Sequence, residues 1–465
     1  MESLTYLQQY TYKVLMCGYN VFLTGDAGTG KTHVLLKFIS DSINKGYNVM
    51  VCAPTGVAAS NINGVTTHRC FDIPLGLLVY NKVEYEVSDE LVETDIVVMD
   101  EISMCRIDTF DFIIKKILQA NNRRKRINKP CIQLVVSGDF LQLPPVMRDN
   151  EKEILDKHYK KDIGAGFAFN SPYWNMMEFK NIILTEIVRQ DNVEFITNLN
   201  RIRVGDKSGL DYIYTNSSQN EINNAITLCG TNLDADNKNR SELNNLIGDS
   251  KIYRAITDGR VRESDTNFEL NLELKVNSRV MLLVNKHSNN ELNYTNGSFG
   301  TVLSLDDDTI SVQLDNGNIE EICRCTWDIH EYTLEEDGKK TKLVKQKVGT
   351  IEQFPLKLAY AITIHKSQGQ TYEYANLSPY CWDCGQLYVA LSRVRKLSNL
   401  YLKYSIDPRY LVISLNVIKF YNSIVKTANQ TLDLTVNKLE TALNKNNEYS
   451  NNELNQILNS LSALK

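Results

Sequence analysis

The chain lacks any apolar run that approaches the roughly 20 residues a membrane-spanning helix needs. Its first residues, Met-Glu-Ser-Leu-Thr-Tyr, also lack the basic and apolar regions of a secretory signal. We therefore expect neither a membrane span nor a membrane partner. We expect an intracellular protein, in the nucleus or cytoplasm of its host cell, whether the source is viral, phage or eukaryotic.

An excess of positive charge is also missing. The 51 Lys and Arg residues are outnumbered by 56 Asp and Glu residues, which gives a formal net charge of −5. Such a chain does not attract a polyanion through its overall field, so any nucleic-acid site must be a local groove. The basic run at 123–126 is interpreted as a solvated loop.

Complete sets of metal-binding cysteine and histidine are absent as well. Ten cysteines are scattered along the chain, and two pairs are close in sequence: Cys323 with Cys325, and Cys381 with Cys384. No nearby histidine and no second pair at the right spacing completes a zinc site, so zinc at Cys381 and Cys384 is the lesser alternative. We interpret the cysteines as reduced thiols.

What is present begins with a parallel-sheet pattern in a chain of 465 residues, long enough for about two to four domains. Short apolar runs at 20–24, 48–53, 95–99 and 131–136 are typical of strands buried on both faces. A glycine-rich loop follows the first, and small or polar clusters follow the others. Because ligands bind at the carboxyl ends of parallel strands, the pattern predicts one shared nucleotide crevice.

The rest of the chain predicts further units. A second α/β unit is expected to begin near 181–185 and to include 225–229. Between about 275 and 355, alternating residues and turns such as Asn296-Gly297 predict a small all-β insertion. An α/β pattern resumes after Pro355. From about 430, apolar residues at helical spacing favour two helices packed on the body over a partner-docking arm.

The stretch from Gly25 to Thr32, Gly-Asp-Ala-Gly-Thr-Gly-Lys-Thr, lies between the first strand and a helical pattern. It matches the phosphate-binding loop G-x-x-x-x-G-K-[ST] in its proper context. The glycines allow a tight turn whose N–H groups converge on phosphate oxygens, and the helix N-terminus adds a positive field. Lys31 would neutralise the β- and γ-phosphates, and the Thr32 hydroxyl would help to hold Mg²⁺. The nucleotide-contacting residues predicted here are Gly25, Ala27, Gly28, Thr29, Gly30, Lys31 and Thr32.

A second set of polar residues suits hydrolysis. Asp100 and Glu101 follow four apolar residues, a Walker-B arrangement in which Asp100 holds Mg²⁺ and Glu101 polarises the attacking water. Gln142 is a neutral group able to contact both a γ-phosphate and that water. Arg189 and Arg393 are candidates for the cations that phosphoryl transfer needs from a second domain. The predicted catalytic set is Lys31, Glu101, Gln142, Arg189 and Arg393.

Eight segments at 24–32, 53–59, 67–71, 98–104, 137–146, 184–190, 360–371 and 388–395 form an ordered set. The set resembles the superfamily 1B DNA helicases, most closely the Pif-type group, which is related to RecD and Dda. The resemblance covers residues from about 4 to 405. It implies ATP and Mg²⁺ as cofactors, with Gln8 reading adenine and Gly369 contacting the nucleotide.

The fold implied by this resemblance is α/β, with two RecA-like P-loop domains, an SH3-like all-β insertion and a helical C-terminal tail. The implied boundaries are 1–178 for domain 1A, with a small wedge 1B within about 65–92, 179–274 and 355–410 for domain 2A, 275–354 for insertion 2B, and 411–465 for the C-terminal helices. The wedge has no clear aromatic pin, and Tyr80 and Tyr85 are the candidates. The segment 104–131 fits the family only loosely, which leaves partner binding and substrate preference open.

Single-stranded DNA would cross the tops of both domains. The implied path is Pro54, Thr55, His68 and Phe140 on the first domain, and Thr231, Asn232, Thr363, His365 and Lys366 on the second. Small hydrogen-bonding or cationic groups grip phosphates without reading sequence, and rings stack on bases.

The implied function is an ATP-dependent DNA helicase or translocase that moves 5′→3′ in replication, repair or recombination. It would act as a monomer on single-stranded and forked DNA, with protein partners at the C-terminal helices. RNA stays an alternative substrate, because a groove that grips the backbone distinguishes RNA through sugar contacts. An ATP-switched scaffold or recruitment subunit without unwinding activity is the alternative function. The intact hydrolytic set argues against it.

Overall fold

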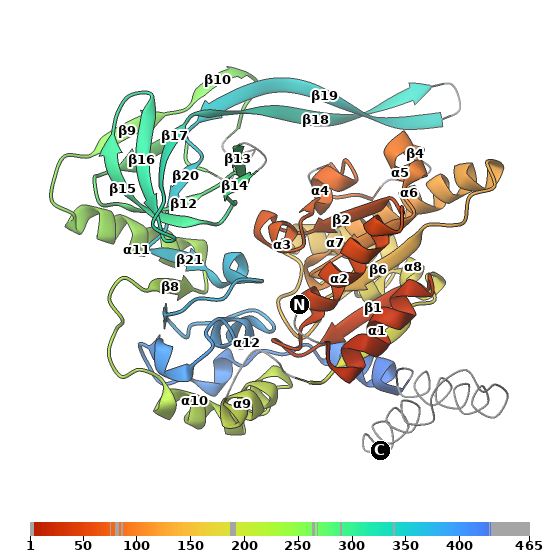
Figure 1. Ribbon diagram of the computed structural model, residues 1–465, viewed down its shortest axis with the longest axis horizontal. Coiled ribbons are helices and arrows are strands. Elements are labelled where there is room, and N and C mark those ends of the chain that lie inside the picture. Colours follow the sequence, from red (N-terminus) through yellow and green to blue (C-terminus); the bar gives the residue numbers. More distant parts are fainter. Residues whose placement is uncertain are drawn as a thin grey trace.

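The computed structural model describes residues 4–74, 76–79, 83–84, 87–186, 192–262, 266, 268–288, 291–337, 340–426 and 428. They form two α/β domains side by side and a β-rich insertion that adjoins the second domain (Figure 1). The predicted α/β fold class, with its all-β insertion, is confirmed. Among these residues, no helix is both long and apolar enough to cross a membrane.

The first domain is built on a six-stranded parallel sheet with the order β3-β2-β5-β6-β1-β7. In that order the strands are Val65–Thr66, Val49–Ala53, Ile96–Met99, Gln133–Ser137, Val21–Gly25 and Lys180–Leu184. Its helices are α1 (Tyr6–Met16), α2 (Lys31–Asn44), α3 (Gly56–Asn61), α4 (Thr67–Cys70), α5 (Asp89–Glu93), α6 (Ile107–Arg126), α7 (Asp149–Tyr159) and α8 (Pro172–Met176). Strands β1, β5 and β6 are buried along their whole length, as the continuous apolar runs predict.

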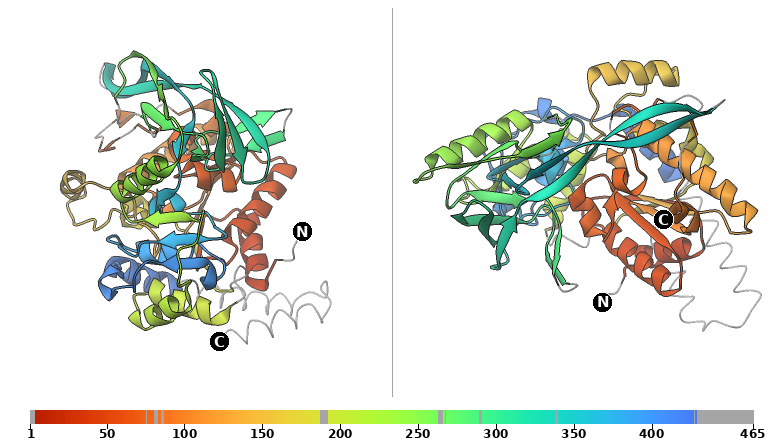
Figure 2. Two further views of the ribbon diagram at one scale, coloured as in Figure 1. Left: turned by 90° about the vertical axis from the view of Figure 1, so that its left-hand side faces the viewer. Right: turned by 90° about the horizontal axis from the view of Figure 1, so that it is seen from above.

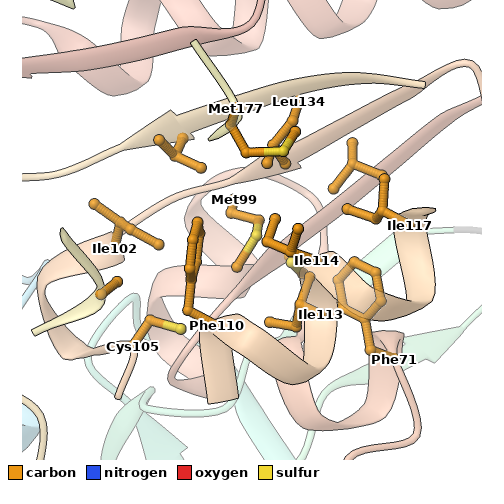
Figure 3. Packing of buried hydrophobic residues seen from close by; sticks show 14 of the residues in the cluster. Phe71, Met99, Ile102, Cys105, Phe110, Ile113, Ile114, Ile117, Leu134 and Met177 are labelled. Atoms are coloured by element: carbon orange, nitrogen blue, oxygen red, sulfur yellow. The ribbon is translucent and has the colours of Figure 1, made fainter. Parts of the chain in front are cut away.

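Helix α6 covers one face of this sheet. Phe110, Ile113, Ile114 and Ile117 recur at helical spacing and belong to the cluster that includes Met99 of β5 (Figure 3). All four are fully buried. Burying a side chain of this size contributes about 1.5–3 kcal/mol, so this face anchors the strand that leads to Asp100.

The basic run at 123–126 is the last turn of α6, which corrects the expectation of a solvated loop. Arg124 is 1% exposed. Its guanidinium donates to the carbonyls of Val92, Thr94 and Pro130 at 2.8, 2.7 and 2.6 Å, and to the Asp95 carboxylate at 2.8 Å. Arg124 therefore closes the α5–β5 turn onto α6 rather than contacting a polyanion.

The second domain has a four-stranded parallel sheet with the order β21-β8-β22-β23. In that order the strands are Ala361–Thr363, Ile226–Cys229, Ala375–Leu377 and Leu400–Leu402. Its helices are α9 (Val193–Arg203), α10 (Leu210–Asn216), α11 (Asn232–Asn245) and α12 (Gln386–Leu391), with a short 3₁₀ turn η5 (Ile364–Ser367). This sheet and helices α9, α10 and α12 share one apolar core.

The insertion contains a five-stranded antiparallel sheet with the order β17-β16-β15-β12-β20. In that order the strands are Ile319–Cys323, Thr309–Leu314, Phe299–Leu305, Arg279–Leu282 and Leu356–Leu358. Around it lie β9 (Lys251–Arg254), β10 (Ile256–Gly259), β11 (Asn271–Leu274), β13 (Lys286–Ser288) and β14 (Glu291–Tyr294). A turn at 315–317 joins β16 to β17, with Gly317 at φ 90°.

A long antiparallel hairpin of β18 (Cys325–Asp337) and β19 (Lys340–Gln353) leaves the insertion and runs over to the first domain (Figures 1 and 2). There Thr341 and Lys342 of β19 pair in parallel with the short strand β4 (Val83–Glu84). Lys345 also forms an ion pair with Asp72 at 3.0 Å. The hairpin therefore makes a direct link between the insertion and the region where the wedge is predicted.

Two expected boundaries differ from the structure. Strand β7, expected to open the second domain, pairs with β1 along its whole length and is an edge strand of the first sheet. Strands β9 and β11 pair with each other, and their buried residues join the core of the insertion, which therefore starts near 251 rather than 275. An apolar run predicts a strand, but the choice of sheet depends on which partner strand lies beside it.

The chain returns to the first domain at its end. The helical segment 415–426 packs on the first domain through Val417, Phe420 and Ile424. Phe420 stacks on Phe169 with ring centroids 4.2 Å apart and an interplanar angle of 8°. The two helices predicted beyond 430 lie outside the described residues.

Candidate functional site

The glycine-rich loop follows β1 and opens helix α2, as predicted. Gly25, Gly28 and Gly30 all have positive φ, at 151°, 83° and 78°. A Cβ on Gly25 would lie 2.3 Å from the carbonyl oxygen of Leu184, so the backbone approach excludes any other residue there. The Lys31 ammonium donates to the carbonyls of Gly25 and Asp26 at 2.9 and 3.1 Å, which holds it over the loop.

The acidic pair lies at the end of β5 next to this loop. Asp100 accepts from the Glu101 N–H at 2.9 Å, and Glu101 has the left-handed φ of 51°. That turn directs the Glu101 carboxylate towards the second domain, where it accepts from Gln368 Nε2 at 3.0 Å. Burial, and next the charge of Asp100, raise the pKa of Glu101. A carboxylate with a raised pKa is a stronger base, which suits the role predicted for Glu101.

The second domain supplies the opposite wall. Arg393 is 3% exposed and donates to the carbonyls of Val389, Ser367 and Gln370 at 2.7, 3.1 and 3.0 Å. Gly369 has a φ of 79°, and its carbonyl accepts from Asn61 Nδ2 of the first domain at 3.2 Å. These contacts hold the 367–370 turn, and with it Arg393, against the seam between the domains.

These groups surround one cavity of about 860 Å³, a size suited to a nucleotide. Its lining includes Ala27, Gly28, Gly30, Lys31, Thr32, Asn61, Glu101, Gln142, Gly369, Gln370 and Arg393. Four of the five predicted catalytic residues therefore meet in one cleft between the domains. The fifth, Arg189, lies outside the described residues, as do Tyr80 and Tyr85 of the predicted wedge.

The donors present fit a nucleoside triphosphate with a magnesium ion. Thr32 offers a hydroxyl in the first turn of α2, and Asp100 offers a carboxylate beside Glu101. Mg²⁺ prefers few protein oxygens plus phosphate and water, so two such donors suffice. In the part of the chain that the structure describes, no group of three His, Cys, Asp or Glu residues could hold a metal. Cys381 and Cys384, the lesser zinc alternative, are therefore not joined by a third such ligand in the described residues.

Gln8 lies at the phosphate loop rather than apart from it. Its side chain is 3% exposed, donates to the Thr29 carbonyl at 3.0 Å and accepts from the Thr5 N–H at 3.0 Å. In this structure the Gln8 amide supports the loop. Its role in reading adenine stays a prediction.

One buried arginine was missed by the sequence reasoning. Arg203 ends α9 in the second domain and reaches the first, where it pairs with Asp26 of the phosphate loop at 2.6 Å and with Asp139 at 2.9 Å. It also donates to the Tyr421 hydroxyl at 2.7 Å. Nothing in its sequence surroundings marks Arg203, because a basic residue at the end of a helix is usually solvated.

Tyr388 makes a second link between the domains. Its hydroxyl accepts from the N–H of Ala27 in the phosphate loop at 3.0 Å. Tyr388 belongs to the 388–395 segment, so a signal for it was present in the sequence. Together, Arg203 and Tyr388 connect the second domain to the loop that would bind phosphate.

The predicted nucleic-acid residues gather at the carboxyl ends of strands in both domains. Thr55 caps α3, Thr231 caps α11 and Thr363 caps η5, each by accepting a backbone N–H. Pro54 precedes Thr55, and Asn232 opens α11 with an exposed side chain. N-terminal turns of helices present free N–H groups to phosphates. The same three threonines also cap their helices, which is an ordinary structural role.

The cationic candidates have distinct surroundings. His68 of α4 is exposed. His365 lies 3.7 Å from the Asp383 carboxylate. Partial removal of the Lys366 ammonium from water, and the neighbouring charge of Lys357, lower the pKa of Lys366 to about 8. Lys366 therefore still carries most of its charge at pH 7.

The expectation for Phe140 is corrected by the structure. Phe140 is 1% exposed and lies in an aromatic core with rings of Phe22, Phe169, Trp174 and Phe420 at 4.9–5.6 Å. A ring enclosed on this many sides is not available to stack on a base. Phe140 therefore positions the loop that carries Gln142 instead of contacting DNA.

Comparisons with known proteins agree with this arrangement. A family described as PIF1-like helicase matches residues 7–209. The ATP-dependent DNA helicase Pif1 of Campylobacter jejuni is 29% identical over 441 residues, which cover 86% of this chain and 94% of that protein. The ATP-dependent DNA helicase PIF1 of Danio rerio is 31% identical, and the match covers 91% of this chain but only 64% of that protein.

Solved structures give the same result. Pif1 from Bacteroides bound to ssDNA is 35% identical with a TM-score of 0.76, covering 91% of this chain and 97% of that one. A complex of Bacteroides Pif1 with ADP-AlF3 and ssDNA is 33% identical with a TM-score of 0.76, covering 92% and 98%. Pif1 from Candida albicans is 28% identical with a TM-score of 0.72, covering 91% and 100%.

Proposed function

This chain belongs to the PIF1-like helicase family and is an ATP-dependent DNA helicase, and we propose that it moves 5′→3′ along single-stranded DNA and opens forks. The observation that carries the proposal is the cleft in which Lys31, Glu101, Gln142 and Arg393 meet from two domains. A nucleotide bound there touches both domains, so its γ-phosphate can control their closure.

In the proposed reaction, water attacks the γ-phosphorus and ADP leaves. Glu101 accepts the proton of the water, and Lys31, Arg189 and Arg393 stabilise the charge that develops on the phosphoryl oxygens. Bound Mg²⁺ would neutralise phosphate charge, with Thr32 and Asp100 as its protein ligands. For Arg393 to reach the phosphoryl oxygens, part of its carbonyl network must be exchanged as the cleft closes.

The Arg203 and Tyr388 contacts would transmit a movement of the phosphate loop to the second domain. Both touch the phosphate loop, so a shift of that loop on nucleotide binding moves α9 and α12 with it. Those elements belong to the domain whose strand ends carry Thr231, Thr363 and Lys366. Closing and opening of the cleft would therefore move the DNA-binding strand ends of one domain along the strand relative to those of the other.

We further propose that the protein works as a monomer on single-stranded and forked DNA in replication, repair or recombination, inside the nucleus or cytoplasm of its host cell. Bacteroides Pif1 bound to ssDNA, and a Pif1 structure described as unwinding forked dsDNA by two coordinating helicases, support these substrates. RNA remains the alternative polymer, and the C-terminal residues beyond 430 remain the proposed place for protein partners.

The test is ATP turnover with and without single-stranded DNA and RNA, followed by unwinding of 5′-tailed and 3′-tailed duplexes. We expect DNA-stimulated turnover and unwinding of the 5′-tailed duplex. Unwinding of only the 3′-tailed duplex would refute the polarity, and turnover without any unwinding would favour the ATP-switched scaffold.

The active-site assignment has its own variant. Lys31→Ala removes the cation at the β- and γ-phosphates and should lower turnover by at least about 100-fold. Lys37→Ala is the matched control. Lys37 lies on the same helix, and its ammonium pairs with Asp41 at 2.8 Å, away from the cleft. Equal loss in both variants would contradict the assignment.

A further inference from the structure

Three large aromatic side chains are exposed in the loops at the carboxyl edge of the second sheet. Tyr380 and Trp382 follow β22, and Tyr404 follows β23, with exposed fractions of 49%, 62% and 47%. The rings of Tyr380 and Tyr404 are 6.0 Å apart. Single exposed apolar groups are ordinary, but several large aromatic groups exposed at one edge of a sheet indicate a binding surface.

Trp382 is held in place although its ring is in water. Its indole N–H donates to the Gly230 carbonyl at 3.1 Å, and its backbone N–H donates to Gln386 Oε1 at 2.9 Å. Gln386 is fully buried and donates to the same Gly230 carbonyl at 2.9 Å. A Cβ on Gly230 would lie 2.2 Å from the Tyr380 carbonyl oxygen, so the strand end fits this loop closely. The indole is therefore fixed in orientation while its face remains open.

The surroundings of Trp382 match a polyanion that carries flat bases. Gly230 immediately precedes Thr231, and the His365 ring lies 6.4 Å from the indole at an interplanar angle of 32°. Lys366 follows His365, and Lys403 lies 5.4 Å from the centre of the Tyr404 ring. Acidic groups here already have partners: Asp383 is engaged by His365 and by the N–H of Cys384 at 2.7 Å, and Asp234 accepts from the Thr231 hydroxyl at 2.7 Å.

We propose that Trp382 is a base-stacking platform for single-stranded DNA on the second domain. Threonine hydroxyls, helix N–H groups and Lys366 would hold the phosphates, while one base lies on the indole. Stacking is tolerant of sequence because every base has a π-face, which suits a motor that moves along any strand. The inference rests on the proposed function, since it assigns a residue to the DNA path.

The first test uses the fluorescence of the chain's three tryptophans on addition of oligo(dT). Trp174 is 5% exposed in the first core, and Trp327 packs on Phe268 in the insertion with ring centroids 4.4 Å apart. Stacking on a base should quench Trp382 alone. Trp382→Phe should therefore lose most of the quench, whereas the matched variant Trp327→Phe should keep it. A full quench in Trp382→Phe would overturn the proposal.

The second test compares the affinity for oligo(dT) with that for a strand of abasic sites. Base–aromatic stacking of about 1–3 kcal/mol predicts that Trp382→Ala binds oligo(dT) about 5- to 150-fold more weakly, with Trp382→Phe in between. On the abasic strand, Trp382→Ala and the wild type should bind alike. Tyr374→Ala is the matched control, because Tyr374 is 46% exposed just before β22, at the opposite edge.

The outcomes separate the inference from the proposed function. Failure of the wild type to bind any single strand would count against the function itself. Wild-type binding that Trp382→Ala leaves unchanged on both strands would overturn only the stacking role.

Discussion

Arg203 shows how much depends on one buried cation between the domains. Its Nε and Nη2 donate to the two carboxylate oxygens of Asp139 at 3.0 and 2.9 Å, and Nη1 pairs with Asp26. Burial alone would raise the pKa of Asp139, but the charge and hydrogen bonds of Arg203 outweigh it and hold that pKa below its usual value. For Asp26 the burial effect prevails and its pKa is raised. Asp139 is therefore the partner that depends most on Arg203.

Arg203→Met should lower the free energy of unfolding by about 3–5 kcal/mol at pH 7, because the Asp139 carboxylate is left buried without its partner. Urea denaturation measures the loss. Arg201→Met, an exposed position on the same helix, should change stability by less than about 0.5 kcal/mol. An equal effect at both positions would show that Arg203 does not stabilise Asp139.

The same pair predicts a pH dependence. Since the folded pKa of Asp139 is lowered, its stabilisation in the wild type is fully present above the unfolded value of about 3.9 and is lost as the pH falls through the folded pKa. Without Arg203, burial would raise that pKa and the folded variant would take up a proton in mild acid. The stability gap between wild type and Arg203→Met should therefore narrow from pH 7 towards pH 4 in the same denaturation series.

At the scale of elements, the strand ends and the turns behind them decide the chemistry. Strand β5 delivers Asp100 and Glu101, β6 leads to the loop of Gln142, and β21 leads to the turn of Gly369. Strands β5 and β6 could be predicted from their apolar runs and their following turns from small and polar residues, whereas β21 falls in the α/β pattern expected after Pro355. Which turns would face one another across the cleft depends on how the two sheets pack.

Gly385, the residue before α12, approaches the backbone of the Gln142 loop closely. Its φ is 70°, and a Cβ there would lie 2.5 Å from the carbonyl oxygens of both Leu141 and Gln142. Gly385→Ala should push α12 away from that loop and lower ATP turnover by about 100-fold, the effect of roughly 1 Å of misplacement. Steady-state turnover at saturating ATP measures this.

Gly317→Ala is the matched control for this substitution. Gly317 also has a positive φ, of 90°, but a Cβ there meets nothing within 4 Å. We expect a stability cost of about 1–2 kcal/mol from the left-handed backbone and unchanged turnover. If Gly385→Ala behaves like Gly317→Ala, the close approach is not needed for hydrolysis.

At the scale of the whole molecule, connections at three places stand out among those that join the first domain to the rest in the described residues. These are the Arg203 and Tyr388 contacts at the cleft, the return of segment 415–426 onto the first core, and the β18–β19 hairpin. The hairpin is the one that reaches the region of the predicted wedge (Figure 2). The strand separation proposed for that region requires it to keep its place while the second domain moves.

A shortened hairpin tests this connection. Joining Tyr332 to Lys345, which are paired in the ladder, through Asn-Gly removes the residues that pair with β4. The lost strand pairing is worth about 1 kcal/mol, so unwinding of a tailed duplex should slow about fivefold. DNA-stimulated ATP turnover should persist, because the hairpin does not line the cleft. Unchanged unwinding would show that the hairpin contact has no part in strand separation.

The sequence by itself determined the parallel strands, the phosphate loop, the Walker-B pair and the all-β insertion, because these depend on local periodicity and on residue types that few other structures need. Only the tertiary structure decided that β7 belongs to the first sheet, that Phe140 is core, that Arg124 and Arg203 are buried, and that Trp382 is exposed. Each of these depends on what lies opposite a side chain in space. Burial, pairing and stacking depend on two groups that are far apart in the chain. The sequence around one of them does not specify which distant group it will meet.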